Sequence, residues 1–170
     1  MTLQDIKRLH AFNAWATNRI FDALAALPAE DFTRDMKASH ASIHGTLTHM
    51  VGAEKMWLSR LAGNADKAMI KPADVPTLAD VKKTWEATGF NLAKFLGTMT
   101  DRKLQETFSM TTATGQQLTQ AYGDALQHMV DHSTYHRAQV VTLLRQMGHT
   151  PPSTTMIGFF RETAKAGKQA

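Results

Sequence analysis

The sequence contains no cysteine among its 170 residues. Disulfide bonds, cysteine-based zinc sites, iron–sulfur clusters and a cysteine nucleophile are therefore excluded. Any metal ion would have to be held by histidine, carboxylate or carbonyl groups. Any thiol chemistry would require a thiol that is supplied from outside the chain.

Long apolar runs are also missing. No stretch approaches the roughly 20 apolar residues that span a bilayer, and the first residues, MTLQDIKRLH, lack the apolar centre of a signal peptide. The formal charge of +4 is small, the basic residues are scattered, and no arginines alternate with aromatic side chains. We therefore expect a cytoplasmic protein whose partners include neither a membrane nor a nucleic acid.

Several sequence motifs of catalysis are absent as well. The chain has no HExxH zinc-protease motif, no GxGxxG or phosphate-loop pattern and no GxSxG serine elbow. No glutamate is followed by a histidine three residues later, which argues against a di-iron carboxylate bundle. The residues that remain as candidates for chemistry are mainly the histidines, of which there are 8.

Helical periodicity dominates what is present. Apolar residues recur at three- and four-residue spacing in four segments, at about residues 3–27, 42–61, 77–96 and 121–147. Residues 104–122 are predicted to form a small β-hairpin that turns at Thr114–Gly115. The pattern predicts an all-α protein, a four-helix bundle with a small β-hairpin before the last long helix. We expect one domain over residues 1–170, with a short C-terminal extension after about residue 150.

The last of these helices carries three histidines at a stride of four: His128, His132 and His136. Because each residue advances about 100° around a helix, all three overlap the apolar face. We therefore expect their rings inside the bundle or along its seam. Buried imidazoles require partners for both ring nitrogens, and a shared metal ion takes one lone pair from each ring.

The second helix offers a further ligand, His49, at the edge of its apolar stripe. Two helices that each place histidine beside the core can meet around one ion. Glu54 lies about 140° around the same helix from His49, which predicts a buried ion-paired or hydrogen-bonded carboxylate rather than a co-ligand. Asn13, in the stripe of the first helix, either lines the site or forms a hydrogen bond to a neighbouring helix.

Two other histidines, His40 and His44, also have a spacing of four. They fall at the start of the second helix, where we expect exposed or capping residues rather than ligands. The alternative to a metal site is a histidine-lined core without an ion, because a single histidine on an apolar face is usually a hydrogen-bonded core residue.

The stretch HMVDHSTYHRAQVVTLLRQMG resembles the final-helix motif of the DinB-like metalloenzymes, a family related to thiol-dependent S-transferases. That motif reads roughly His-x-x-Asn-His-x-x-x-His-Arg-x-Gln, followed by a Leu-Arg pair and a glycine. The matching residues are His128, Asp131, His132, His136, Arg137, Gln139, Leu144, Arg145 and Gly148. Asp131 stands where asparagine is commoner. The stretch TLTHMVGAEKMWL is similar to the family's second-helix motif, and the likeness extends over about residues 3–160.

The resemblance implies a four-helix bundle with a metal ion held by His49, His132 and His136. His128 matches a position that is often histidine but is not one of the three ligands. Members of the family are often homodimers, so a homodimer is also implied. Relatives that use a low-molecular-weight thiol imply that the ion would bind such a thiol as thiolate, for attack on an electrophilic small molecule.

Three functions are compatible with a site of this kind. The first is a metal-dependent transferase that uses a low-molecular-weight thiol. The second is a metal-dependent hydrolase that acts through bound hydroxide, and the third is a non-catalytic bundle that its ion stabilises. As the divalent ion, three histidines suit zinc or nickel first, and cobalt, iron or copper after them. The sequence assigns no catalytic base.

Overall fold

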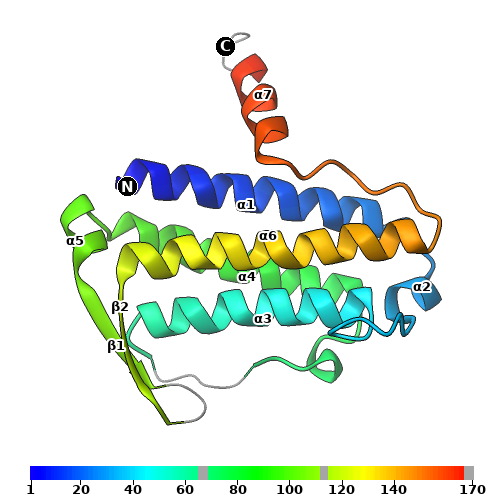
Figure 1. Ribbon diagram of the computed structural model, residues 1–170, viewed down its shortest axis with the longest axis horizontal. Helices are drawn as coiled ribbons and strands as arrows, with labels where there is room; N and C mark the ends of the chain where they lie inside the picture. The colour runs from blue at the N-terminus through cyan, green and yellow to red at the C-terminus, as the bar shows by residue number, and fades with distance from the viewer. Residues whose placement is uncertain (65–68, 112–114, 167–170) are drawn as a thin grey trace.

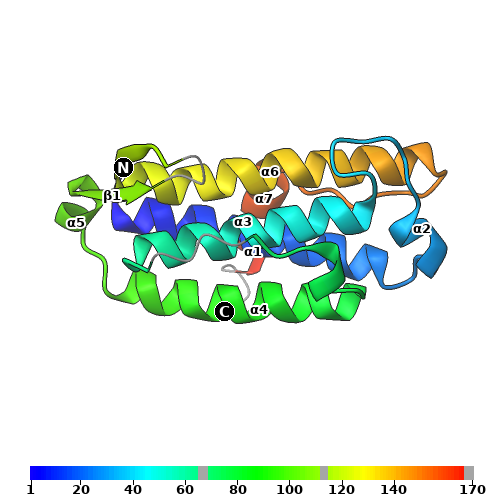
Figure 2. The same ribbon diagram turned by 90° about the horizontal axis from the view of Figure 1, so that it is seen from below.

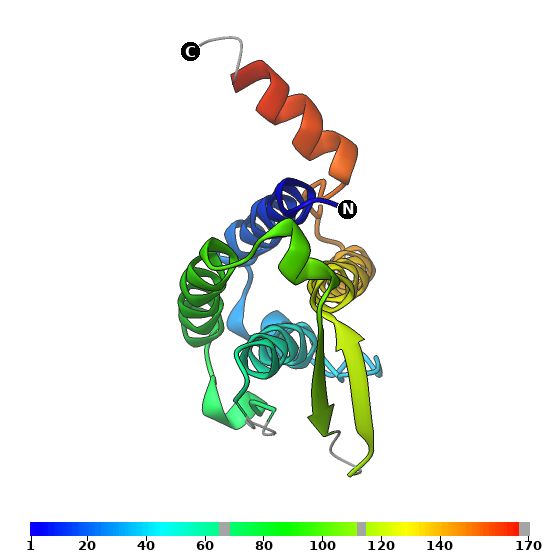
Figure 3. The ribbon, with the colours of Figure 1, turned by 90° about the vertical axis from the view of Figure 1, so that its left-hand side faces the viewer.

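A computed structural model describes residues 1–64, 69–111 and 115–166 (Figure 1). Four long helices make up most of this part of the chain: α1 (Leu3–Leu24), α3 (Ile43–Leu61), α4 (Leu78–Gly97) and α6 (Tyr122–Gln146). They lie side by side, as the end-on view in Figure 3 shows. Within the described residues, no helix combines the length and apolar character that crossing a bilayer requires.

The remaining elements are short. They are the helices α2 (Ala29–Thr33), α5 (Asp101–Gln105) and α7 (Met156–Ala166), the 3-10 helix η1 (Pro72–Asp74), and the strands β1 (Thr107–Thr111) and β2 (Gln117–Ala121). The chain is thus mostly helical with one small hairpin, which confirms that part of the predicted fold class.

The two strands form the predicted hairpin. They pair in antiparallel register, with Thr107 opposite Ala121 and Thr111 opposite Gln117. Figure 2 shows the hairpin and α5 at one end of the long helices and α2 at the other end. Thr114, the first residue of the predicted turn, lies outside the described residues.

Local sequence explains where the long helices begin and end. Thr77 and Asp80 form a reciprocal capping box at the start of α4. The Ser42 hydroxyl caps α3 by accepting a hydrogen bond from the Gly45 backbone N–H at 3.0 Å. Directly beyond the C-cap of α6, Gly148 adopts φ 83°, the left-handed conformation in which glycine is favoured.

The helix boundaries differ from the prediction in two respects. α1 ends at Leu24 rather than near Leu27, because Pro28 restricts the residue before it and has no N–H to continue the helix. The helices α2 and α5 were not predicted, since each spans 5 residues and is too short for a periodic pattern. The predicted C-terminal extension contains the helix α7.

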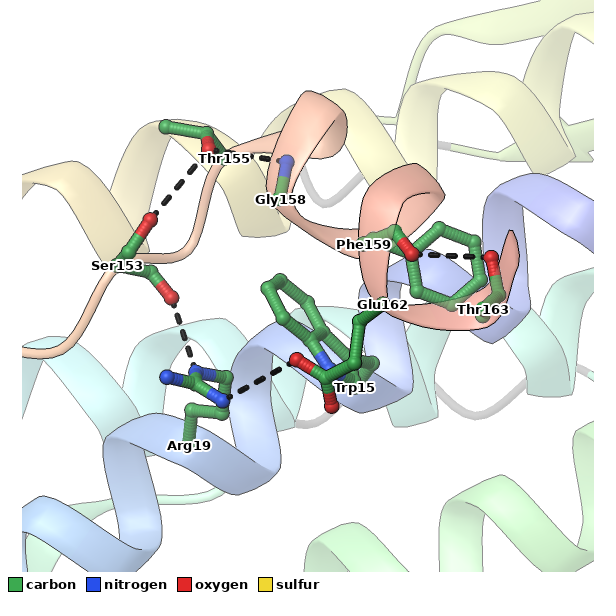
Figure 4. A network of polar contacts seen from close by, with 8 residues as sticks. All are labelled: Trp15, Arg19, Ser153, Thr155, Gly158, Phe159, Glu162 and Thr163. Carbon is green, nitrogen blue, oxygen red and sulfur yellow. Dashed lines mark hydrogen bonds and ion pairs between the residues drawn. The ribbon is translucent and has the colours of Figure 1, made fainter. Parts of the chain in front are cut away.

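Helix α7 lies on the outer side of α1 and projects away from the other long helices (Figures 1 and 3). Figure 4 shows the contacts that hold it. The indole N–H of Trp15 donates to Glu162 at 3.1 Å, and Arg19 donates to the Ser153 carbonyl at 3.0 Å. The Phe159 ring packs on Trp15, with 5.8 Å between ring centroids.

Apolar side chains of the described residues form three clusters, of which the third packs α1 and α6 against Phe159 of α7 and the other two follow one another along the long helices. One cluster includes Ile20, Leu47 and Val140, and the other, toward the hairpin end, includes Ile6, Leu58 and Leu126. Buried polar residues lie between the two clusters on all four long helices. We call this group the polar layer: Asn13, Thr17, Glu54, Thr88, Ser133 and Arg137.

Candidate metal centre

Three histidine rings meet where α3 lies against α6. The Nε2 atom of His49 lies 3.3 Å from the Nε2 atom of His132. The Nε2 atom of His136 lies 3.2 Å from that same His132 atom. The structure thus brings together the three residues that the family resemblance singles out, and we call them the histidine cluster.

The helices place these rings through ordinary packing. His132 and His136 are one turn apart on α6 and therefore lie on the same face. Met50 on α3 and Val140 on α6 are fully buried and fix the rotation of their helices about their axes. Each helix consequently presents its histidines at the flank of the core.

Gln139 sets the protonation pattern of one ring. Its side-chain oxygen lies 2.7 Å from the Nδ1 atom of His136. An amide oxygen accepts hydrogen bonds, so Nδ1 carries the proton and the lone pair of His136 lies on Nε2. That lone pair belongs to the atom that faces His132.

The rings of the cluster are neutral at neutral pH. Burial is the main cause that lowers the pKa of His49 and His132 to about 4, and the neighbouring histidines lower it further. Burial also lowers the pKa of His136, against the opposing effect of Gln139. Neutral imidazole is the form that binds a metal ion.

The contacts within the cluster fit a cation better than a hydrogen-bond network. The Nε2 atom of His132 has two nitrogen neighbours, and one N–H cannot point at both. A tetrahedral ion with bonds of 2.0–2.1 Å to nitrogen separates its ligands by about 3.4 Å. The observed separations of 3.2 and 3.3 Å match that spacing.

His40 also reaches the cluster, which the sequence analysis did not expect. Its ring stacks on His49, with 4.1 Å between centroids and 17° between planes. The ligand atoms of His40, His49 and His136 lie within 4.8 Å of one another, a group that could hold a metal ion. The expectation that His44 is exposed or caps the helix is wrong: Ser42 is the N-cap, and His44 is buried with its Nε2 donating to the Val75 carbonyl at 2.8 Å.

His128 lies beside the cluster rather than in it. The residue is exposed, so the expectation that all three α6 histidines point inward is wrong for this one. Its ring meets Trp57 edge-on at 5.2 Å and lies 5.8 Å from the His132 ring. One turn of α6 therefore separates a surface histidine from a half-buried one.

Glu54 belongs to the polar layer, where it accepts hydrogen bonds as predicted. The Asn13 amide donates to its carboxylate at 3.2 Å, and the Ser133 hydroxyl donates at 3.0 Å. Full burial raises the pKa of Glu54 to about 7, against the smaller opposing effects of these bonds and of Arg137. The contact from Asn13 also settles the role of that residue, which connects α1 to α3.

Arg137 belongs to the polar layer and reaches it from α6, a role that its sequence pattern did not predict. Its guanidinium donates to Asn13, to the Thr17 hydroxyl at 3.1 Å and to the Thr134 hydroxyl at 2.8 Å. Burial lowers its pKa to about 10, which leaves it charged at neutral pH. The layer therefore ties α1, α3 and α6 together at mid-height.

A groove of about 720 Å³ between α1 and α4 reaches the far side of this layer, with His10, Asn13 and Glu54 among its lining residues. His10 is buried, and in the described part of the chain neither ring nitrogen forms a hydrogen bond of normal geometry, although the Leu126 backbone lies beside the ring. Burial lowers its pKa to about 4. Its spacing of four from Ile6 was the signal that places it on the apolar face. The groove is large, but its donor atoms do not converge as the histidine cluster does.

The protein is mostly helical, and the ligand atoms of its His40, His49 and His136 lie close enough together to hold a metal ion. The model of the DinB family matches residues 2–168, and the chain therefore belongs to the DinB family. It is similar to protein DinB of Bacillus subtilis, with 24% identity over 166 residues that cover 94% of this chain and 96% of that protein.

Two further likenesses agree with this placement. The Bacillus subtilis protein YizA is 26% identical over 132 residues, which cover 78% of this chain and 81% of YizA. The crystal structure of a DinB-like protein from Bacillus cereus superimposes with a TM-score of 0.68 at 19% identity, over 89% of this chain and 97% of that one. This structural likeness supports the fold.

Proposed function

We propose that this protein is an enzyme that activates a low-molecular-weight thiol for transfer to an electrophilic small molecule. In this proposal His49, His132 and His136 hold one divalent metal ion. The observation that carries the proposal is the convergence of three neutral imidazoles, with Nε2 separations of 3.3 and 3.2 Å. Membership of the DinB family supports it.

The chain's own residues supply the conditions for this chemistry. Three neutral ligands leave the ion its full double charge, and when bound the ion lowers the pKa of a thiol that it coordinates. Gln139 holds the His136 ring in the tautomer that presents Nε2. The polar layer fixes α3 and α6 relative to each other, and the thiol comes from outside because the chain has no cysteine. We assign no general base.

We further propose that the four long helices form a single four-helix-bundle domain over residues 1–170, with α7 as its extension. The side-by-side arrangement in Figure 3 supports this. Zinc or nickel suits three histidines first, and cobalt, iron or copper after them. The family resemblance supports a homodimer, and the composition supports a cytoplasmic location without nucleic-acid or membrane partners.

The proposal is tested by loading the tag-free protein with Co²⁺ and adding 2-mercaptoethanol, with 2-methoxyethanol as the matched probe that lacks sulfur. We expect a thiolate-to-cobalt charge-transfer absorption with the thiol alone, and no such band in His132→Ala. A cobalt-loaded protein that gives no band at any thiol concentration contradicts thiol activation. Turnover of an ester such as p-nitrophenyl acetate without thiol would instead indicate a hydrolase.

A further inference from the structure

We infer that His40 is a displaceable fourth ligand of the metal centre, which a loop holds against the other histidines and which an incoming thiol replaces. The loop comprises residues 36–42, between α2 and α3, and we call it the His40 loop. The inference rests on the proposed function, because it assigns a role at the same ion.

The position of the His40 ring carries the inference. It stacks on His49 at 4.1 Å and tilts against His136 at 5.3 Å between centroids. The ligand atoms of these three residues lie within 4.8 Å of one another. Ligands of one tetrahedral ion are about 3.4 Å apart, so His40 reaches the fourth position when its ring turns about its side-chain torsions and gives up the stacking on His49.

The backbone of the His40 loop is built to hold this position. Two non-glycine residues, Lys37 and Ala41, adopt left-handed conformations with φ 56° and φ 61°, which side chains rarely adopt unless the surroundings impose them. The backbone N–H of Met36 donates to the Ala41 carbonyl at 2.7 Å, and the N–H of Ala41 donates to the Ala38 carbonyl at 2.9 Å. These bonds close the loop on itself.

Gly45 lets the His40 loop lie directly on the first turn of α3. A Cβ atom at this position would stand 2.0 Å from the His40 carbonyl oxygen, which is closer than any side chain permits. The main chain of His40 therefore rests on a helix surface that glycine alone leaves open. That contact sets the height of the imidazole above His49.

Three observations favour displacement over permanent ligation. His40 lies in a loop, whereas the three residues of the histidine cluster lie within α3 and α6. In the described part of the chain the His40 ring also forms no hydrogen bond, and a ligand without an outer partner is held less firmly. The His40 loop also borders a surface pocket of about 410 Å³, whose opposite wall includes Tyr135 and Gln139 of α6. Residues 36–39, which line this pocket, directly precede His40, so a shift of the His40 loop into the pocket would carry the ring away from the ion.

The reaction that we infer is an exchange of ligands. The bond from the ion to the His40 nitrogen would break, a bond from the ion to the thiolate sulfur would form, and the thiol proton would pass to solvent. His49, His132 and His136 would keep their places throughout. The ion would thus have four nitrogen ligands at rest, and three nitrogens and one sulfur when a thiol is bound.

The experiment compares Co²⁺ complexes of tag-free wild type, His40→Ala and Gly45→Ala, with His128→Ala and Gly97→Ala as matched controls. A Cβ atom at Gly97 would meet nothing within 4 Å, so this control isolates the clash at Gly45. The readouts are the visible absorption of cobalt, its affinity, and the affinity for 2-mercaptoethanol. Circular dichroism verifies the helical fold of each variant.

We expect His40→Ala to bind one cobalt ion with an affinity about 10–100-fold lower than wild type and with a weaker absorption, because water replaces a nitrogen. Gly45→Ala should shift the absorption in the same direction while all histidines remain. With saturating 2-mercaptoethanol the spectra of wild type and His40→Ala should converge, and the thiol should bind more tightly to His40→Ala.

The results that would contradict a displaceable His40 differ from those that would contradict the metal site itself. An unchanged cobalt affinity and spectrum in His40→Ala would contradict the inference and leave the three-histidine site standing. Complete loss of cobalt in His40→Ala, or spectra that stay different with thiol, would show that His40 is a permanent ligand. A wild type that binds no divalent ion would overturn the proposed function and this inference together.

Discussion

The histidine cluster and the polar layer share the helices α3 and α6, yet they satisfy their polar atoms in opposite ways. In the polar layer donors meet acceptors: Asn13 and Ser133 donate to Glu54, and Arg137 donates to Asn13. In the cluster the Nε2 atoms of three rings face one another. Within the described residues most polar atoms of the layer are paired, and the Nε atom of Arg137 is a buried exception, whereas the Nε2 atoms of the histidine cluster face one another without oxygen acceptors.

Burial acts on both regions, with different consequences. In the polar layer it raises the pKa of Glu54 to about 7 and lowers that of Arg137 to about 10. The opposite charges of the two groups partly offset the cost of removing them from water. In the cluster every group is a base, so burial and mutual repulsion both lower the pKa. The layer therefore joins the helices, whereas the cluster is a group of neutral bases that could hold a cation.

We expect the largest loss of stability when Arg137 is removed from the polar layer. Arg137→Ala should lower the free energy of unfolding by about 3–5 kcal/mol, because Asn13 and Thr17 lose a buried charged donor and Glu54 loses the positive charge that acts on it. The measurement is urea denaturation of the metal-free protein. Arg145→Ala, which removes an exposed arginine from the same helix, is the control. An equal, small loss in both variants would show that the layer does not hold the helices.

The second prediction concerns the pH dependence of Glu54. Its pKa is raised from 4.5 in the unfolded chain to about 7 in the fold, so between these values the native state binds more protons. Stability from this group is therefore present at low pH and is lost as pH rises through 7, by up to about 3 kcal/mol.

Glu54→Gln isolates this contribution. The difference in unfolding free energy between wild type and Glu54→Gln cancels the titration of the histidines, which both proteins share. In urea titrations we expect wild type to become less stable relative to Glu54→Gln as the pH rises from 5 to 8. A difference that stays constant over this range would mean that the carboxylate is not perturbed as described.

The third prediction concerns Gln139, the hydrogen-bond partner of His136. Gln139→Ala should lower metal affinity about 10–100-fold while the helical fold is kept, because the His136 ring loses the partner that sets its tautomer. Competition titration with a chelator measures the affinity. Gln127→Ala, at an exposed position of the same helix, should leave it unchanged. Equal affinities in the two variants would remove Gln139 from the site.

We expect the smallest effects from replacing His128, which lies beside the histidine cluster. His128→Ala should change metal affinity by less than about threefold and the free energy of unfolding by less than about 0.5 kcal/mol, as is usual for an exposed side chain. Chelator competition and urea denaturation check both values. A loss of metal affinity as large as that expected for a ligand would mean that the site extends one turn further along α6.

Much of this arrangement could be predicted from local patterns. The spacing of apolar residues located all four long helices, and the stride of four placed His132 and His136 on one face of α6, because both signals depend on neighbours along one helix. The same reasoning placed Glu54 away from the His49 side of α3. These predictions needed no knowledge of how distant segments meet.

The parts that could not be predicted depend on distant contacts. His40 reaches the cluster through a loop with two left-handed residues, and no periodic pattern reports such a loop. The burial of Arg137 depends on Asn13 and Thr17, more than a hundred residues earlier in the chain. The exposure of His128 depends on where the surface of the packed helices falls, which the helical wheel of α6 alone does not define.

The most direct test of the central claim is the metal content of the tag-free protein after exposure to divalent ions and dialysis. Wild type should retain about one ion per chain, as one shared site requires, and His49→Ala and His132→Ala should retain almost none despite an unchanged helical fold. A wild type without bound metal, or variants that keep the full amount, would contradict the assignment of the histidine cluster as a metal centre.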